Sequence, residues 1–166
     1  GEPLDNFDNV VKFLQLITDE NGANISQRNI TLSTCGLVPK INQLADMHLQ
    51  ITLALSLHAS NNETRKKLMP IAYKYTIDEI IDACKNYFKK TGRRITFEYS
   101  LVAGQNDRKQ EADELSNLIK GINCHVNLIP VNPIKERDFV QPTKEAAKQF
   151  KSRLEKNRIN VTIRRE

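Results

Sequence analysis

The sequence has few cysteines and no long apolar segment, and both features exclude classes of protein. Its three cysteines, Cys35, Cys84 and Cys124, are odd in number and far apart, so they indicate neither a disulfide framework nor a close-spaced metal motif. Cys84 lies on an apolar helical stripe and Cys124 opens a strand, so only Cys35, at a strand end, is expected near a ligand. No apolar run approaches the roughly 20 residues of a membrane span, and the first residues do not resemble a signal peptide. We therefore expect a reducing, cytoplasmic compartment and no membrane partner.

Glycine-rich phosphate loops, linkers, low-complexity segments and internal repeats are also missing from the sequence. The hydrophobic content of 39% and the charged content of 27% are ordinary for a globular protein. The 166 residues suffice for one domain with a hydrophobic core, and we predict a single domain over residues 1–166. The net charge of +5 fits a polyanionic partner and, equally well, a basic but otherwise ordinary enzyme surface.

Strand-like runs alternate with helical patterns along the chain. The spacing of apolar residues predicts helices near residues 6–20, 38–47, 60–70, 76–90, 107–119 and 143–154, with Ser60, Thr76, Asp107 and Thr143 as N-caps. Strands are expected near residues 29–34, 50–57, 95–102, 124–130 and 159–163. This order predicts an α/β fold with a mainly parallel sheet and right-handed crossovers. The polar, aperiodic segment 133–142 is the best candidate for a mobile loop over a site.

The two ends differ from a complete series of strand–helix units. Only a few residues, beginning with Gly1, Glu2 and Pro3, precede the first expected helix, and no helix follows the last expected strand. We therefore expect a piece of a longer protein, whose missing first strands leave an exposed sheet edge and a risk of self-association.

Polar residues follow nearly every strand-like run, at the edge where parallel α/β proteins bind ligands. The candidates are Glu2, Ser33, Thr34, Ser56, His58, Glu98, Asn127 and Asn132. A carboxylate at a turn can hold an ammonium group, and serine and asparagine offer the donors and acceptors that a nucleoside or an amino acid needs. No nucleophile–base pair can be assigned from spacing, so the residues alone predict a small-molecule or cofactor site.

Several candidates have structural alternatives that the sequence leaves open. Ser33 and Thr34 could cap the following helix. His58 could be a satisfied core or capping histidine. Glu98 could form an ion pair on the sheet face, and Asn132, before a proline, could form a turn.

Five segments occur in an order and at spacings that resemble one known family. They are GEPL at 1–4, RNITLSTCGLVPKI at 28–41, LALSLHA at 53–59, FEY at 97–99 and VNLIPVNP at 126–133. Together they resemble the radical S-adenosylmethionine (SAM) methyltransferases that modify C2 of adenine in 23S ribosomal RNA (rRNA) and transfer RNA (tRNA). The resemblance covers essentially the whole chain. A close relative is the Cfr-type enzyme, which methylates C8.

The resemblance implies an incomplete (β/α)6 partial barrel of the radical SAM type, with SAM as cofactor. The implied cofactor-binding residues are Gly1, Glu2, Ser33, Ser56, Leu57, His58 and Asn132. The first two would hold the amino group of the methionine part, and the third would contact the cofactor from the next strand end. Residues 56–58 would line the SAM pocket, partly through backbone groups, and the asparagine would contact the nucleoside.

The resemblance also implies chemistry that depends on residues outside this chain. In the family a [4Fe-4S] cluster reduces SAM to a radical, which activates a methyl group carried on a C-terminal cysteine for transfer to adenine. An electron donor such as flavodoxin or ferredoxin is implied. The Cys-x-x-x-Cys-x-x-Cys cluster loop and a glutamate base are expected upstream of Gly1, and the methyl-carrying cysteine beyond Glu166. We therefore expect no catalytic or metal-binding residue in this chain and no turnover by it alone.

Two alternatives remain open. Within the superfamily, the enzyme could be a Cfr-type C8 methyltransferase or catalyse another radical SAM reaction. From a different class, the chain could be a non-catalytic basic RNA-binding module. Its footprint would be Lys144, Lys148, Lys151, Arg153, Lys156, Arg158, Arg164 and Arg165, which equally fit a solvated helix and strand end.

Overall fold

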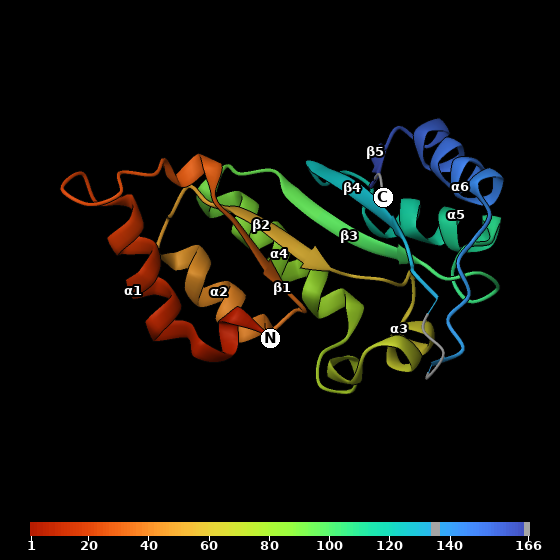
Figure 1. Ribbon diagram of the computed structural model, residues 1–166, viewed down its shortest axis with the longest axis horizontal. Coiled ribbons are helices and arrows are strands. Elements are labelled where there is room, and N and C mark those ends of the chain that lie inside the picture. The colour runs from red at the N-terminus through yellow and green to blue at the C-terminus, as the bar shows by residue number, and fades with distance from the viewer. Residues whose placement is uncertain (134–136, 165–166) are drawn as a thin grey trace.

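The computed structural model describes residues 1–133 and 137–164, and its centre is a five-stranded parallel sheet (Figure 1). The strands are β1 (Thr31–Thr34), β2 (Thr52–Ser56), β3 (Ile95–Leu101), β4 (Cys124–Pro130) and β5 (Asn160–Ile163), and they pair in chain order. All four pairs are parallel, so the predicted mainly parallel α/β sheet is confirmed. Parallel strands that pair in chain order need crossover connections, for which a right-handed turn is the general rule, and the predicted handedness stays a prediction.

The helices begin and end close to the expected positions. They are α1 (Phe7–Thr18), α2 (Val38–Asp46), α3 (Asn62–Leu68), α4 (Ile77–Thr91), α5 (Lys109–Leu118) and α6 (Lys144–Lys156). Three short 3-10 helices, η1 (Pro3–Asn6), η2 (Gln27–Asn29) and η3 (Pro70–Tyr73), complete the described elements. None of the described helices combines the length and apolar character needed to cross a membrane.

Two of the four predicted helix caps are correct. Thr76 and Thr143 accept backbone N–H groups at the starts of α4 and α6. The prediction for Ser60 is wrong, because its hydroxyl donates to a carboxylate on α5 and Asn61 caps α3 instead. The prediction for Asp107 is also wrong, because its carboxylate accepts a backbone N–H three residues earlier and closes the turn before α5.

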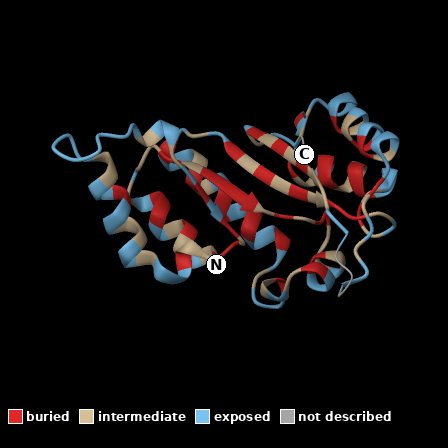
Figure 2. Cartoon of the chain, in the orientation of Figure 1, coloured by how far each residue is buried: buried red, intermediate tan, exposed pale blue. Residues whose placement is uncertain are grey.

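The two faces of the sheet differ in chemistry. One continuous row across all five strands is buried against the helices and consists of Thr34, Leu55, Phe97, Val126 and Val161. The opposite face carries two mostly polar rows: Ser33, Ala54, Thr96, His125 and Asn160, then Ser56, Glu98, Asn127 and Thr162. Figure 2 shows the resulting alternation of buried and half-buried residues along β3. Most parallel sheets are apolar on both faces, so a polar face left partly exposed in the described part of the chain indicates a binding surface.

Strand β1 forms one edge of the described sheet. Thr31 and Ser33 on this strand are exposed. Self-association through this edge stays a prediction, as does the mobility of segment 133–142, in which residues 134–136 lie outside the described residues.

Candidate functional site

Three side chains from three consecutive strands meet near the carboxyl ends of the strands. Ser56 on β2 lies opposite Glu98 on β3 in the sheet register. The hydroxyls of Ser33 and Ser56 donate to Oε2 of Glu98 at 3.5 and 3.4 Å, close to the upper limit for a hydrogen bond. Among the described residues Glu98 forms no ion pair. This group, which we call the serine–glutamate cluster, therefore offers a carboxylate and two hydroxyls that are not locked to one another.

Glu2 joins the N-terminal turn to the end of β1, where the N-terminus lies in Figure 1. Its carboxylate accepts hydrogen bonds from the Leu4 N–H at 3.1 Å, the Thr34 hydroxyl at 2.8 Å and the Cys35 N–H at 2.7 Å. Burial raises the pKa of Glu2, but the hydrogen bonds from Cys35, Thr34 and Leu4 outweigh burial and hold this pKa below its usual value. The Thr34 hydroxyl accepts the N–H of Gly36 at 3.2 Å, and α2, whose N-cap residue is Leu37, has no side-chain cap. Glu2 carries a negative charge at the strand end.

His58 follows β2 with a left-handed backbone, at a φ of 59°. Its Nδ1 accepts the N–H of Ser100 at 2.9 Å, so the ring proton lies on Nε2. Burial, together with the charge of Arg65, lowers the His58 pKa to about 4, and the ring is neutral at pH 7. The alternative that His58 is a satisfied structural histidine is therefore correct for its Nδ1. Its Nε2 has no hydrogen-bond partner among the described residues and can donate to a ligand.

Arg65 of α3 is a site residue that the sequence reasoning missed. It is fully buried, and its guanidinium donates to the carbonyl oxygens of Cys35 at 2.6 Å, Ser56 at 3.2 Å and Leu57 at 3.1 Å. Burial lowers its pKa, and its Nη1 has no hydrogen-bond partner in the described part of the chain. This one side chain links the ends of β1 and β2. The sequence signal for its burial was weak: Arg65 lies three residues before Leu68, on the same face of a helix that is otherwise mostly charged.

Asn106 is a second residue that the sequence reasoning missed. It is fully buried, and its Nδ2 donates to the carbonyls of His58 at 2.9 Å and Ser100 at 2.7 Å. Its Oδ1 accepts the N–H of Val102 at 2.8 Å. Asn106 thus holds the end of β3 against the segment that carries His58.

The remaining predicted residues are less closely connected to the serine–glutamate cluster. The Leu57 side chain is buried in the core, and its N–H donates to the carbonyl of Glu98 at 3.0 Å. Asn127 lies opposite Glu98 in the register. Gly1 and Asn132 are exposed, and their roles stay predictions.

The cysteines do not form a metal site in the described part of the chain, where no group of three or more His, Cys, Asp or Glu side chains could hold a metal. Cys84 and Cys124 are buried, as predicted, and Cys35 is half-buried at the end of β1. Burial raises the thiol pKa of Cys35 and of Cys84 to about 12, and that of Cys124 to about 11. Because metals bind the thiolate, these three residues are poor ligands.

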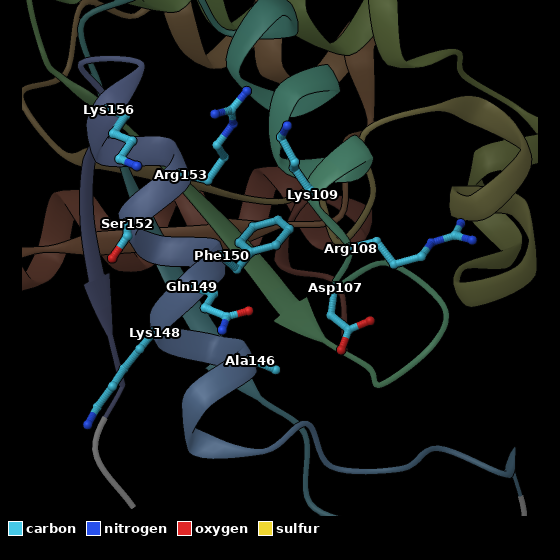
Figure 3. A pocket seen from close by; sticks show the side chains of 10 residues that line it. All are labelled: Asp107, Arg108, Lys109, Ala146, Lys148, Gln149, Phe150, Ser152, Arg153 and Lys156. Atoms are coloured by element: carbon cyan, nitrogen blue, oxygen red, sulfur yellow. The ribbon is translucent and has the colours of Figure 1, made fainter.

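A basic groove of about 700 Å³ lies between α5 and α6 (Figure 3). It includes Arg108, Lys148, Arg153 and Lys156, of which three belong to the predicted RNA footprint. Arg153 is paired with Asp113 at 2.6 Å, so the footprint is partly neutralised. Residue 165 of that footprint lies outside the described residues.

Comparisons with known proteins agree on one superfamily. The family model described as "Radical SAM superfamily" matches residues 1–116. A protein of Lachnospira eligens, "Probable dual-specificity RNA methyltransferase RlmN", is 64% identical over 166 residues, which are 100% of this chain and 47% of that protein. A protein of Clostridium novyi with the same name is 60% identical over 100% of this chain and 48% of that protein. The chain thus spans about half the length of the curated relatives it matches.

Solved structures support the same relationship. A radical SAM methyltransferase from Sphaerobacter thermophilus matches with a TM-score of 0.95 and 43% identity, over 99% of this chain and 48% of that chain. A domain of pyruvate-formate lyase-activating enzyme from Bacteroides vulgatus matches with a TM-score of 0.73 and 14% identity, over 99% of this chain and 95% of that chain, and is similar in fold alone. The open, mainly parallel sheet expected for a radical SAM core is therefore confirmed. The chain belongs to the radical SAM superfamily.

Proposed function

We propose that residues 1–166 are part of one catalytic domain that binds SAM, in an enzyme that methylates C2 of adenine in 23S rRNA and in tRNA. The observation that carries the proposal is the convergence of Glu2, Ser33, Ser56 and His58 on neighbouring strand ends. Relatives named as dual-specificity RNA methyltransferases, 57–64% identical over the whole chain, support the RNA substrate.

The chemical groups at the strand ends fit SAM. Glu2 and Glu98 supply carboxylates for an ammonium or ribose hydroxyl, and Ser33 and Ser56 supply hydroxyls that donate or accept. The neutral His58 ring supplies a donor at Nε2. Bound SAM supplies the methyl group for transfer, and these residues bind and orient it against a sheet face held fixed by Arg65.

An iron–sulfur cluster does not fit the cysteines of this chain, which are dispersed and have raised pKa values. We propose that the cluster ligands, the base and the methyl-carrying cysteine belong to other segments of the intact enzyme, and that flavodoxin or ferredoxin supplies electrons in the cytoplasm. Anaerobic reconstitution of residues 1–166 with iron and sulfide should give no stable stoichiometric cluster. A stable cluster would overturn this assignment.

SAM affinity tests the cofactor site. Glu2→Ala, Ser56→Ala and Asn132→Ala should each weaken SAM binding by the protein as its gene encodes it, measured by calorimetry under anaerobic conditions. Ser152→Ala, at an exposed position of α6, is the matched control and should bind SAM as the unchanged protein does. Unchanged affinity in all three site variants would remove the proposed cofactor site.

The methylated position is tested in RNA. Deleting the gene should remove 2-methyladenosine from both 23S rRNA and tRNA, measured by chromatography and mass spectrometry of digested nucleosides. Loss of 8-methyladenosine instead would indicate a Cfr-type specificity. No change in either nucleoside, together with salt-dependent RNA binding and no SAM binding, would favour the non-catalytic module.

A further inference from the structure

Tyr73 at the end of η3 is unusually exposed for an aromatic side chain. Its exposed fraction is 76%, larger than that of Leu16, Val140 and Phe13, which range from 58% to 60%. A single exposed apolar residue has no special meaning, so the surroundings of the ring decide what Tyr73 can bind.

Positive charges surround the Tyr73 ring. Lys66 Nζ lies 5.5 Å from the ring centroid. Lys66, Lys67 and Arg137 line a depression of about 300 Å³ together with Tyr73 and Phe139. All three cations are exposed, and none forms an ion pair with a described acidic residue. The depression therefore combines an accessible ring with unneutralised positive charge.

The depression lies on the side of the molecule where the proposed cofactor site opens. The chain runs directly from β2, through His58, into α3 and η3 (Figure 1). Segment 137–139 belongs to the connection that follows the end of β4. Both parts of the depression thus belong to connections that leave the carboxyl edge of the sheet, the edge of the serine–glutamate cluster.

An accessible aromatic ring beside flexible cations fits an unpaired nucleotide, because the base stacks on the ring and the phosphates meet the cations. The groove between α5 and α6 lacks this combination. Its aromatic residue, Phe150, is buried, and Arg153 is engaged by Asp113. Figure 3 shows Arg108 extending away from α6 rather than across that groove. That groove offers charge without a stacking surface.

We propose that Tyr73, with Lys66, Lys67 and Arg137, forms a stacking platform for an unpaired nucleotide of the RNA substrate. This inference rests on the proposed function, since it assumes that the partner is RNA. The platform holds the RNA near the carboxyl edge of the sheet, and Tyr73 is a binding residue that takes no part in the chemistry.

RNA binding tests the platform. The probe is a fluorescein-labelled single-stranded RNA 12-mer, and anisotropy is measured with the protein as its gene encodes it. Tyr73→Ser should raise the Kd by roughly 10-fold, within the range for loss of one stacked base. Tyr73→Phe keeps the ring and should stay within about twofold of the unchanged protein. Phe13→Ser removes another exposed ring, on α1, and should also leave the Kd unchanged.

The charges are tested through salt dependence. Lys66→Gln combined with Lys67→Gln should reduce the slope of log K against log salt by about 1.4, the value for two lost phosphate contacts on a single strand. Lys12→Gln, an exposed change on α1, should leave the slope unchanged. Equal affinity of Tyr73→Ser and the unchanged protein for the RNA would overturn the platform alone. Absence of RNA binding by the unchanged protein would overturn both the platform and the proposed substrate.

Discussion

Replacing Arg65 tests whether one buried guanidinium holds the strand ends together. Arg65→Met keeps much of the side-chain volume but removes the donors to the carbonyls of Cys35, Ser56 and Leu57. A buried carbonyl that loses a charged donor costs about 1–3 kcal/mol, a penalty that applies in full to Leu57 and in part to half-buried Cys35 and Ser56. The variant also removes a buried charge whose Nη1 has no hydrogen-bond partner in the described structure. Removing that charge is favourable and offsets part of the loss in stability. We therefore expect the free energy of unfolding to fall by about 3–5 kcal/mol.

Urea unfolding followed by far-UV circular dichroism measures this loss. Thermal unfolding should show a midpoint lower by roughly 10 °C. Lys67→Met makes a similar change at an exposed position on the same helix and should alter stability by less than about 0.5 kcal/mol. Arg65→Lys keeps the charge, but one ammonium lacks the planar fork that reaches three carbonyls, so an intermediate loss is expected. A loss below about 1 kcal/mol for Arg65→Met would refute the reasoning, because the buried Leu57 carbonyl alone should cost at least that much when it loses its charged donor.

Three further predictions follow from local features of the site. The native pKa of His58, about 4, lies below its ordinary value of 6.5. The unfolded chain therefore takes up a proton before the native one does, and stability is lost as the pH falls from about 6.5 to about 4, by up to roughly 3 kcal/mol. His58→Asn keeps an acceptor and tolerates the left-handed backbone, so this part of the acid sensitivity should disappear in urea unfolding at pH 7 and 4.5; an unchanged pH dependence would contradict the assignment. Gly36→Ala should lower the free energy of unfolding by about 2 kcal/mol or more, because the new Cβ would lie 3.0 Å from Ile80 Cδ1 at a φ of 105°. Gly92→Ala is the control, since no atom lies within 4 Å of its new Cβ. It should lose only about 1 kcal/mol in the same assay. Iodoacetamide at pH 8 should label Cys35 far more slowly than a model peptide, because a thiol pKa of about 12 leaves about one thiolate in ten thousand; labelling at the peptide rate, measured by mass spectrometry, would disprove this.

The features that could be predicted from the sequence are those with local signals. The alternation of β-branched runs and amphipathic helices is written in consecutive residues, and so are the caps at Thr76 and Thr143. The meeting of Ser33 and Ser56 follows from the same logic, because parallel strands end at a common edge. The side chains on those ends could therefore be named before the register was known.

The features that could not be predicted depend on contacts between distant segments. Asn106 bonds to His58 across 48 residues, and nothing in a turn sequence indicates that partner. Arg65 lies in a run of charged residues whose neighbours Lys66 and Lys67 are exposed, so only the folded chain reveals which cation is buried. The wrong cap at Ser60 has the same origin, since its hydroxyl donates to a carboxylate on another helix.

The polar face of the sheet and the connections at its carboxyl edge differ in how freely their residues can be substituted. The polar rows are fixed by hydrogen-bonded strand pairing, so a side chain in them can be replaced but not moved. Exposed positions of the connections beyond the strand ends, such as Lys66 and Lys67 in the segment through α3 and η3, carry no such constraint and tolerate substitution, whereas buried Arg65 in the same segment does not. The proposed SAM site is thus tied to the strand pairing, whereas the proposed RNA-binding surface can change at exposed positions of the connections.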